Sequence, residues 1–213
     1  MTRRQLLSRK TLAAAALVVF VGAAGASGAL ATPGGPQGKY VAACPTYKLV
    51  TPFTPWADAG SYYMVPSGGF EPPLQAWSLS GGASIVTGNE SYFVNSKKDS
   101  HALSLPAGSS ATSPSVCVSL YSPDMRVFVR NTGASSTLQV SLNYTDANGN
   151  SRTASIASLG GGSSWSLSPY VLFLWQILPV VGLDNQTWVS FTFASSGGNW
   201  QIDDFYVDPI KHH

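Results

Sequence analysis

The amino-acid sequence predicts an all-β domain whose strands form an antiparallel sandwich or barrel. From Gly69 onward, short runs of alternating apolar and polar residues are separated by Gly, Ser, Asn and Pro. Roughly ten such runs follow one another at short, even spacing, and no convincing helical pattern interrupts them. This organisation is typical of sandwiches and barrels, in which each strand has one buried face.

The predicted strands follow one another in order along this region. They comprise residues 76–80, 83–87, 92–94, 102–105, 116–120, 125–130, 138–144, 152–156, 165–167, 187–193 and 199–209. Asn148 and Gly149 lie between two of the alternating runs. Because both residues tolerate positive φ, this dipeptide predicts a tight hairpin.

The segment 170–183 differs from the rest because it is continuously apolar. It predicts either a strand buried on both faces and followed by a loop, or a short core helix that ends at Pro179. The alternative is an exposed apolar patch that contacts a partner. We favour burial, since short apolar runs are common in protein cores.

The first 31 residues predict a secretory signal peptide. A basic start that includes Arg3 and Arg4 is followed by the apolar stretch 11–25, and residues 29–31 form an A-x-A cleavage site. The paired arginines are compatible with either the Sec or the twin-arginine route. The apolar stretch is short for a bilayer and no second one replaces it, so we expect a secreted, extracellular protein without a membrane span after cleavage.

Residues 32–66 predict a linker and a proline-rich arm. The prolines of this region argue against a central strand, while its aromatic residues indicate that the arm packs over the core. We expect an extended arm with one edge strand. The β domain then spans residues 67–209, and residues 210–213 form a tail that ends in His212 and His213.

The net charge excludes a nucleic-acid-binding groove. The whole chain has 12 Lys and Arg and 10 Asp and Glu. Four of the basic residues lie in the predicted signal peptide, which leaves 8 − 10 = −2 for the exported chain. A weakly acidic chain with few charged residues fits a neutral, polar surface rather than a basic patch.

Cys44 and Cys117 are the two cysteines of the chain. In an exported protein, such a pair predicts a disulfide, which here would tie the N-terminal arm to a central strand. The alternative is two buried free thiols. Neither cysteine has a neighbouring His that would complete a zinc site.

Two adjacent carboxylates, Asp203 and Asp204, interrupt the apolar residues of the last predicted strand. A buried carboxylate without a partner is costly, because it loses its hydration. We therefore expect either a bulge that turns one of the acids outward or a cation beside it.

The order of motifs resembles the galactose-binding-like β-jelly rolls, including the carbohydrate-binding modules of bacterial glycoside hydrolases. The similarity lies in Gly68-Gly69-Phe70-Glu71, Trp77, Asp99-Ser100-His101-Ala102-Leu103, Trp165 and Trp200-Gln201-Ile202-Asp203-Asp204-Phe205. The whole chain also resembles small secreted proteins of actinobacteria. The resemblance implies that the predicted sandwich is a jelly roll and that it binds a glycan.

The same resemblance implies a structural calcium between the first and last strands. Its carboxylate ligands would be Glu71 and Asp203, and backbone carbonyls would complete the coordination. The alternative is that Glu71 is a solvated loop residue and that Asp203 caps backbone amides at a bulge. Ser67 stands where the family has Asn, and Pro72-Pro73 is unusual after the glutamate.

Catalytic motifs are scarce in this sequence. The G-x-S-x-G motif of serine hydrolases is absent, and His101 is the only histidine before the C-terminal pair. A glycoside hydrolase needs two opposed carboxylates, whereas Asp203 and Asp204 are adjacent in a strand and would point apart. The sequence thus leaves enzymatic activity uncertain and favours a non-catalytic protein.

The tryptophans are the candidate sugar-binding residues, because a flat aromatic ring stacks on the apolar face of a sugar. Trp77, Trp188 and Trp200 alternate with apolar partners, so we expect them in the core. Trp56, Trp165 and Trp175 lie near Pro, Gly or Ser, so we expect them to be exposed and name them as ligand-binding candidates.

The sequence is therefore compatible with three functions. The first is a secreted, non-catalytic module that binds a polysaccharide or cell-wall glycan. The second is an extracellular adhesion or structural protein that self-associates through the apolar segment 170–183. The third is a glycoside hydrolase.

Overall fold

The computed structural model describes residues 44–121, 124–181 and 185–208. The chain divides into two compact units, residues 1–37 and 38–213, and every described residue belongs to the second unit. The predicted signal peptide, the linker up to residue 43 and the C-terminal tail lie outside the described residues. Among the described residues, no helix is long and apolar enough to cross a bilayer.

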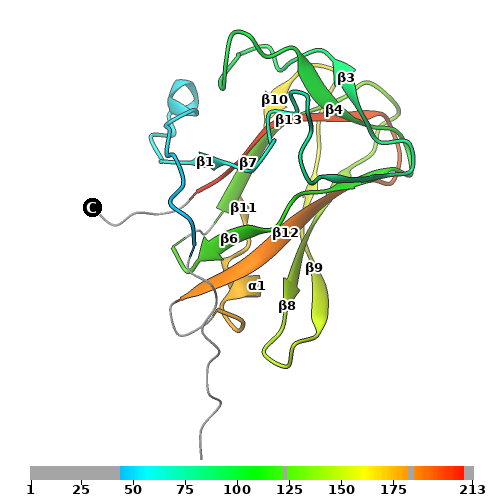
Figure 1. Cartoon of the computed structure of the whole chain (residues 1–213). Coiled ribbons are helices and arrows are strands. Elements are labelled where there is room, and N and C mark those ends of the chain that lie inside the picture. Colours follow the sequence, from blue (N-terminus) through cyan, green and yellow to red (C-terminus); the bar gives the residue numbers. More distant parts are fainter. Residues whose placement is uncertain (1–43, 122–123, 182–184, 209–213) are drawn as a thin grey trace, which may run out of the picture. The chain divides into compact units, whose positions relative to one another are not determined.

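Within this part of the chain, almost all regular structure is β. In sequence order the elements are η1 (Thr54–Trp56), β1 (Tyr63–Met64), β2 (Ser78–Ser80), β3 (Ser84–Thr87), β4 (His101–Leu105), β5 (Ser110–Thr112), β6 (Val116–Ser119), β7 (Asp124–Asn131), β8 (Leu138–Thr145), β9 (Ser151–Leu159), β10 (Ser166–Leu167), β11 (Val171–Leu172), α1 (Leu174–Ile177), β12 (Gln186–Ser195) and β13 (Trp200–Val207) (Figure 1).

The strands form two antiparallel sheets. We call them sheet I, with the order β10-β7-β13-β4-β3, and sheet II, with the order β2-β5-β12-β8-β9. Strands β1 and β11 extend sheet I, and β6 pairs with β12 in sheet II. Eight strands, taken in sequence as β4, β5, β7, β8, β9, β10, β12 and β13, have the orders 1-8-3-6 and 2-7-4-5 in the two sheets. Because this order is that of a jelly roll, the predicted fold is confirmed.

The main core lies between the two sheets and follows the period-2 pattern of the strands. In β12, Val189, Phe191 and Phe193 are buried while their neighbours in the strand are half-exposed. The rings of Phe191 and Phe193 each pack edge-on against Phe205 of β13, with centroids 5.2 Å apart. The alternation of side chains along each strand therefore builds the sandwich, as expected.

The predicted hairpin is confirmed between β8 and β9. Gly149 has a φ of 83°, and its amide donates to the carbonyl of Asp146 at 2.9 Å. Because Gly has no Cβ, it adopts this conformation without steric cost.

The apolar segment after β10 contains both predicted forms, because the short strand β11 is followed by the helix α1, which ends at Ile177 just before Pro179. Its burial on both faces is not found. Val171, Phe173 and Ile177 are buried in the core. Four other side chains of the same segment are exposed, namely Tyr170 (52 %), Leu172 (56 %), Trp175 (73 %) and Leu178 (48 %). Each of the two elements has one buried and one exposed side, since Val171 and Ile177 face the core while Leu172 and Trp175 face solvent.

A second cluster lies on the outer face of sheet I, where the N-terminal arm covers it. Phe128 of β7 and Tyr206 of β13 point to this face, because their strand neighbours belong to the main core. Phe53 and Tyr62 of the arm are buried against them, and the ring centroids of Phe53 and Tyr206 lie 5.4 Å apart. The described part of the predicted arm, from Cys44 onward, thus packs over sheet I, and β1 is its short strand, paired with β13.

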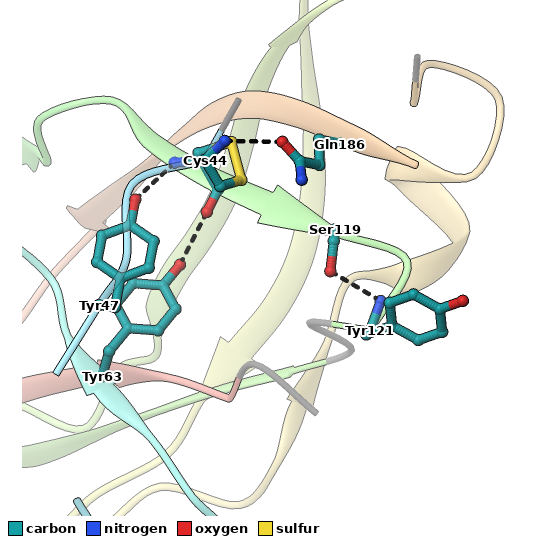
Figure 2. The surroundings of a disulfide bond; sticks show 7 residues. Cys44, Tyr47, Tyr63, Ser119, Tyr121 and Gln186 are labelled. Carbon is teal, nitrogen blue, oxygen red and sulfur yellow. Dashed lines mark hydrogen bonds between the residues drawn. A yellow bond between two sulfur atoms is a disulfide. The ribbon is translucent and has the colours of Figure 1, made fainter. Parts of the chain in front are cut away.

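The disulfide predicted between Cys44 and Cys117 is present, with its sulfur atoms 2.04 Å apart. Figure 2 shows how the arm is further fastened around it. The amide of Cys44 donates to Gln186 Oε1 at 2.7 Å, and the amide of Cys117 donates to the hydroxyl of Tyr47 at 3.1 Å. Tyr47 stacks on Tyr63 with ring centroids 3.9 Å apart.

A buried ion pair holds the other end of the arm. Arg126 of β7 donates from Nη1 to Asp58 Oδ2 at 2.8 Å, and both side chains are more than 90 % buried. The hydroxyl of Tyr62 and the amide of Gly60 also donate to this carboxylate. Burial opposes ionisation of Asp58, but these hydrogen bonds outweigh it and lower its pKa.

We predict that Asp58→Ala destabilises the fold by about 3–5 kcal/mol, because it leaves the Arg126 guanidinium buried without a partner. Urea denaturation monitored by tryptophan fluorescence measures the loss. Asp146→Ala removes an ion pair whose Arg152 side chain is about half exposed, so this control should lose much less. Equal losses in the two variants would contradict the assignment.

The same ion pair should make stability depend on pH. A carboxylate whose pKa is lowered in the folded state contributes stability above its ordinary pKa of about 4, and this contribution is lost as the pH falls through the folded value. The difference between the wild type and Asp58→Ala should therefore shrink on acidification below about pH 4.

Candidate functional site

The two sheets differ in what covers their outer faces. The arm lies on sheet I, and the disulfide end of the arm reaches Cys117 in β6 of sheet II. The remaining outer face of sheet II carries the side chains that alternate with the core positions of its strands. We call these residues the hydroxyl face: Ser78, Ser80, Ser110, Thr112, Gln139, Ser141, Asn143, Thr153, Ser155, Ser158, Ser190 and Thr192.

One row of hydroxyls crosses all five main strands of sheet II. In register, it runs through Ser78, Thr112, Thr192, Ser141 and Ser155. Neighbouring strands are about 4.8 Å apart, so the row spans about 19 Å. No member of the hydroxyl face is charged.

Hydrogen bonds hold part of this face in a fixed arrangement. Asn143 donates from Nδ2 to Thr192 Oγ1 at 2.8 Å and accepts from Thr153 Oγ1 at 2.8 Å. The hydroxyls of Thr112 and Thr192 lie 2.8 Å apart, and Gln139 Nε2 donates to Ser158 Oγ at 2.8 Å. The face is therefore an ordered array of uncharged donors and acceptors, which can bind a neutral polar ligand.

Trp188 also belongs to the outer side of sheet II, so the prediction that it lies in the core is wrong. It is only half-buried and pairs across the strands with Cys117. The buried residues of β12 are Thr187, Val189, Phe191, Phe193 and Ser195, which places position 188 on the opposite face. Trp77 and Trp200 are buried, as predicted.

The structure separates the three predicted ligand-binding tryptophans. Trp165 is 6 % exposed, so the expectation that it is exposed is wrong; the guanidinium of Arg130 lies over its ring, 4.7 Å from the centroid. Trp56 is half-buried and packs edge-on against Phe128 in the cluster beneath the arm. Trp175 is 73 % exposed, as expected, and lies on α1. The three rings thus lie on different elements and form no common platform.

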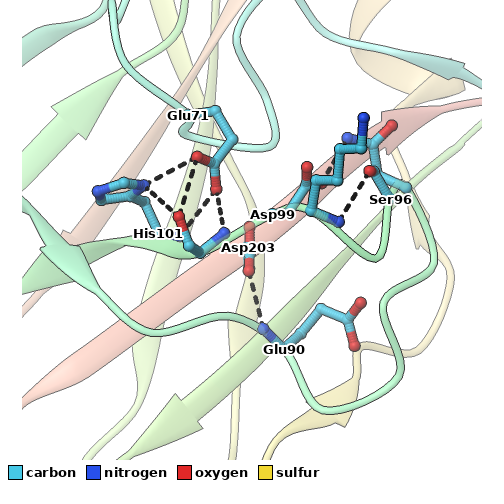
Figure 3. Close-up of polar contacts among 9 residues, drawn as sticks. Glu71, Glu90, Ser96, Asp99, His101 and Asp203 are labelled. Carbon is cyan, nitrogen blue, oxygen red and sulfur yellow. Dashed lines mark hydrogen bonds and ion pairs between the residues drawn. The ribbon is translucent and has the colours of Figure 1, made fainter.

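We call the part of sheet I that contacts the loop between β3 and β4 the loop end of sheet I. Both predicted calcium ligands, Glu71 and Asp203, lie there (Figure 3). Glu71 accepts hydrogen bonds from the amides of Ser100 and His101 and from His101 Nδ1, the last two at 2.8 Å. Burial raises the pKa of Glu71, but these contacts outweigh it and lower the pKa. Glu71 is therefore more firmly held than the solvated loop residue of the alternative.

Asp203 follows the alternative interpretation, in which it caps backbone amides at a bulge. Its two oxygens accept from the amides of Glu90 and Asp204, both at 2.9 Å, and the register of β13 shifts between Asp203 and Tyr206. Burial and the neighbouring Asp204 raise the pKa of Asp203 to about 9. No hydrogen bond or ion pair between described residues joins Glu71 to Asp203.

Asp204 and Glu90 complete a buried acidic group, and of these two residues sequence reasoning missed Glu90. Glu90 is fully buried and accepts from the amides of Tyr92 and Val94, while Asp204 Oδ2 accepts from the amide of Asn95 at 3.2 Å. These carboxylates thus hold the loop that follows β3. Glu90 sits in a polar loop sequence without a recognisable pattern, so no signal marked it.

The chemistry of this group is partly suited to a cation. Asp204 Oδ1 is buried without a hydrogen-bond partner, and burial together with Glu90 raises the pKa of Asp204 to about 8. A Cβ at Gly69 would lie 3.3 Å from this oxygen, so the missing side chain leaves room there. Within the described ranges, however, no three His, Cys, Asp or Glu side chains are arranged as a metal site.

A groove of about 370 Å³ lies between the arm and the loop that follows β3. Its lining residues are Lys48, Val50, Thr51, Pro52, Tyr63, Met64, Val94, Asn95 and Tyr206. None of them is a carboxylate, so this groove lacks the acid pair of a glycoside hydrolase.

Comparisons with known proteins find similarity at the level of solved structures. No family model matches the chain, and no curated protein sequence matches it. The CBM22-1 xylan-binding domain from Paenibacillus barcinonensis Xyn10C is 13 % identical over 67 % of this chain and 91 % of that chain, with a TM-score of 0.45. TmCBM61 in complex with β-1,4-galactotriose is 19 % identical over 69 % of this chain and 98 % of that chain, with a TM-score of 0.40.

A third similar structure is the family 11 carbohydrate-binding module of Lic26A-Cel5E from Clostridium thermocellum. It is 14 % identical over 73 % of this chain and 99 % of that chain, with a TM-score of 0.41. Since these similarities are low, the jelly-roll assignment rests on the strand order of this chain itself.

Proposed function

We propose that this protein is a non-catalytic module that binds a neutral polysaccharide on the hydroxyl face of sheet II. The observation that carries the proposal is the uncharged row from Ser78 to Ser155, which crosses five strands. The strand spacing is about 4.8 Å, comparable to the length of one sugar residue, so successive residues of a glycan can meet successive strands. Each Ser or Thr hydroxyl both donates and accepts, which matches the hydroxyls of a sugar.

The absence of charge on this face favours a neutral glycan over an acidic one. A charged ligand would lose hydration on binding without gaining an ion pair. Among the similar structures, one is a xylan-binding domain and another is a complex with β-1,4-galactotriose. These names supply the first polysaccharides to test.

We predict that Thr192→Val weakens binding to such a polysaccharide about tenfold, because it removes the hydroxyl that contacts both Asn143 and Thr112. Affinity electrophoresis in gels containing xylan, galactan or β-glucan, followed by calorimetry on the best ligand, measures the change. Thr87→Val is the matched control, since Thr87 is an exposed strand threonine on sheet I. The proposal fails if no polysaccharide binds, or if both variants lose the same affinity.

A second candidate function is self-association through the exposed residues of the 170–178 segment. It is favoured by the exposure of four large side chains within nine residues, because a contiguous exposed apolar patch often marks an interaction site. Trp175 serves both hypotheses, because its ring could equally stack on a sugar.

Trp175→Ala distinguishes the two roles of this ring. If the segment mediates assembly, the variant should shift the sedimentation coefficient of a concentrated sample towards the monomer value and leave polysaccharide affinity unchanged. If the ring stacks on sugar, affinity should fall by about tenfold, corresponding to about 1–2 kcal/mol. A variant indistinguishable from the wild type in both measurements would exclude both roles.

We also propose a structural calcium at the loop end of sheet I, as the family resemblance implied. Glu71 and Asp203 would be its carboxylate ligands, and the Oδ1 of Asp204, which has no hydrogen-bond partner, supports a cation in this acidic group. Bound calcium would supply the positive charge that the buried acids lack.

We also propose that the protein is exported through the Sec or twin-arginine route. The Cys44–Cys117 disulfide supports this proposal, because disulfides persist in oxidising compartments.

We predict that millimolar calcium raises the thermal midpoint of the wild type relative to EDTA at pH 7.5. For a ligand at about 100 times its dissociation constant, the stabilisation would be about 2.7 kcal/mol. Asp204→Asn should lose most of this shift, whereas Asp146→Asn, in the exposed turn between β8 and β9, should retain it. A midpoint that is identical in calcium and EDTA would rule the site out.

A further inference from the structure

Asp124 and Asp208 lie opposite each other at the end of the β7–β13 pair. The amide of Asp208 donates to the carbonyl of Asp124 at 3.0 Å, one step beyond the register pair Met125–Val207. Alternation places both aspartates on the outer face of sheet I, where Arg126 and Tyr206 also point. Side chains opposite each other in an antiparallel pair have Cβ atoms about 5 Å apart, so these two carboxylates are neighbours.

Among the described residues, the guanidinium of Arg126 lies near these aspartates but already has other partners. Arg126 donates to Asp58 and, through Nε and Nη2, to the carbonyl of Ser168. Among the described residues, neither Asp124 nor Asp208 has an ion-pair partner. Like charges directly opposite each other destabilise a sheet, so the pair needs a counter-charge or a proton.

Asp124 carries the second, independent observation. The residue is only 6 % exposed, and its Oδ1 is buried without a hydrogen-bond partner. Burial, then Asp208 and Asp58, raise the pKa of Asp124. Asp58 is saturated by Gly60, Tyr62 and Arg126, so its oxygens are not available.

We propose that Asp124 and Asp208 bind a hard divalent cation of the calcium type at this end of sheet I. Hard cations prefer carboxylate oxygens and accept water and backbone carbonyls as further ligands, which suits a site with two protein carboxylates. Asp208 is half-exposed and gives the ion a path from solvent, while the buried Asp124 supplies the oxygen that lacks a partner. The site is distinct from the one at Glu71, Asp203 and Asp204, and it is independent of glycan binding.

Such an ion would fasten the end of β13 to the start of β7. Leu172 of β11 pairs with Asp124 on the other side of β7. A bound cation would therefore stiffen three strands at the point from which the exposed 170–178 segment emerges.

Terbium(III) luminescence tests the proposal on the whole protein, because Tb³⁺ replaces Ca²⁺ and is excited through nearby tyrosines such as Tyr62 and Tyr206. We expect the wild type to show a sensitised signal that calcium displaces. Asp124→Asn and Asp208→Asn should each weaken one binding step about tenfold or more, because the site loses ligand charge. Circular dichroism confirms that each variant is folded, and Asp208→Asn is the milder change since its side chain is half-exposed.

Two controls separate this site from the other acids. Asp146→Asn, at an exposed turn, should leave the titration unchanged. Asp204→Asn should leave the Asp124-dependent step intact, even if it removes another. The proposal is overturned if Tb³⁺ does not bind, or if Asp124→Asn and Asp208→Asn titrate as the wild type does. It is also overturned if Asp204→Asn alone removes every binding step.

Discussion

The rest of the structure depends on the attachment of the N-terminal arm to the outer face of sheet I. A sandwich has two outer faces, and the arm removes one of them from solvent by burying Phe53 and Tyr62 on Phe128 and Tyr206. It is held at one end by the Cys44–Cys117 disulfide and at the other by the buried pair of Asp58 and Arg126. Since sheet I is closed in this way, the ordered polar residues of sheet II form the open sheet surface on which a long ligand can lie.

Sheet I carries the second unusual feature of the molecule, which is a pair of carboxyl groups buried in an apolar strand. Asp203 and Asp204 are placed there by a bulge, and they hold the loop after β3 through its backbone amides together with Glu90. Amide donors lower the cost of burying a carboxylate, yet the pKa values of both aspartates stay well above the ordinary range. A bound proton or a bound cation would relieve the remaining cost, because either one neutralises a buried carboxylate.

The sequence was informative where a local pattern determines the structure. Period-2 alternation predicted most of the strands, although residues 92–94 lie in the loop after β3 and form none. Asn148-Gly149 predicted the hairpin, and the export context predicted the disulfide. The sequence also encodes the position of Trp188, because Val189, Phe191 and Phe193 set the buried face of β12 and position 188 lies on the other face. The prediction that Trp188 lies in the core counted its apolar neighbours without using this register. Glu90 and the stacking of Arg130 on Trp165 depend on contacts between distant segments, which no local pattern reveals.

The most direct test of the account is a map of amide chemical shifts in ¹⁵N-labelled protein titrated with the polysaccharide that it binds best. If the arm closes sheet I and leaves sheet II for the ligand, the shifts should concentrate in β8, β9 and β12, around Ser141, Asn143 and Thr192. The arm from Val50 to Tyr62 should keep its spectrum. Shifts confined to the arm, to the loop after β3 or to α1 would contradict the account, because the ligand would then lie on the face that the structure shows as covered or outside both sheets.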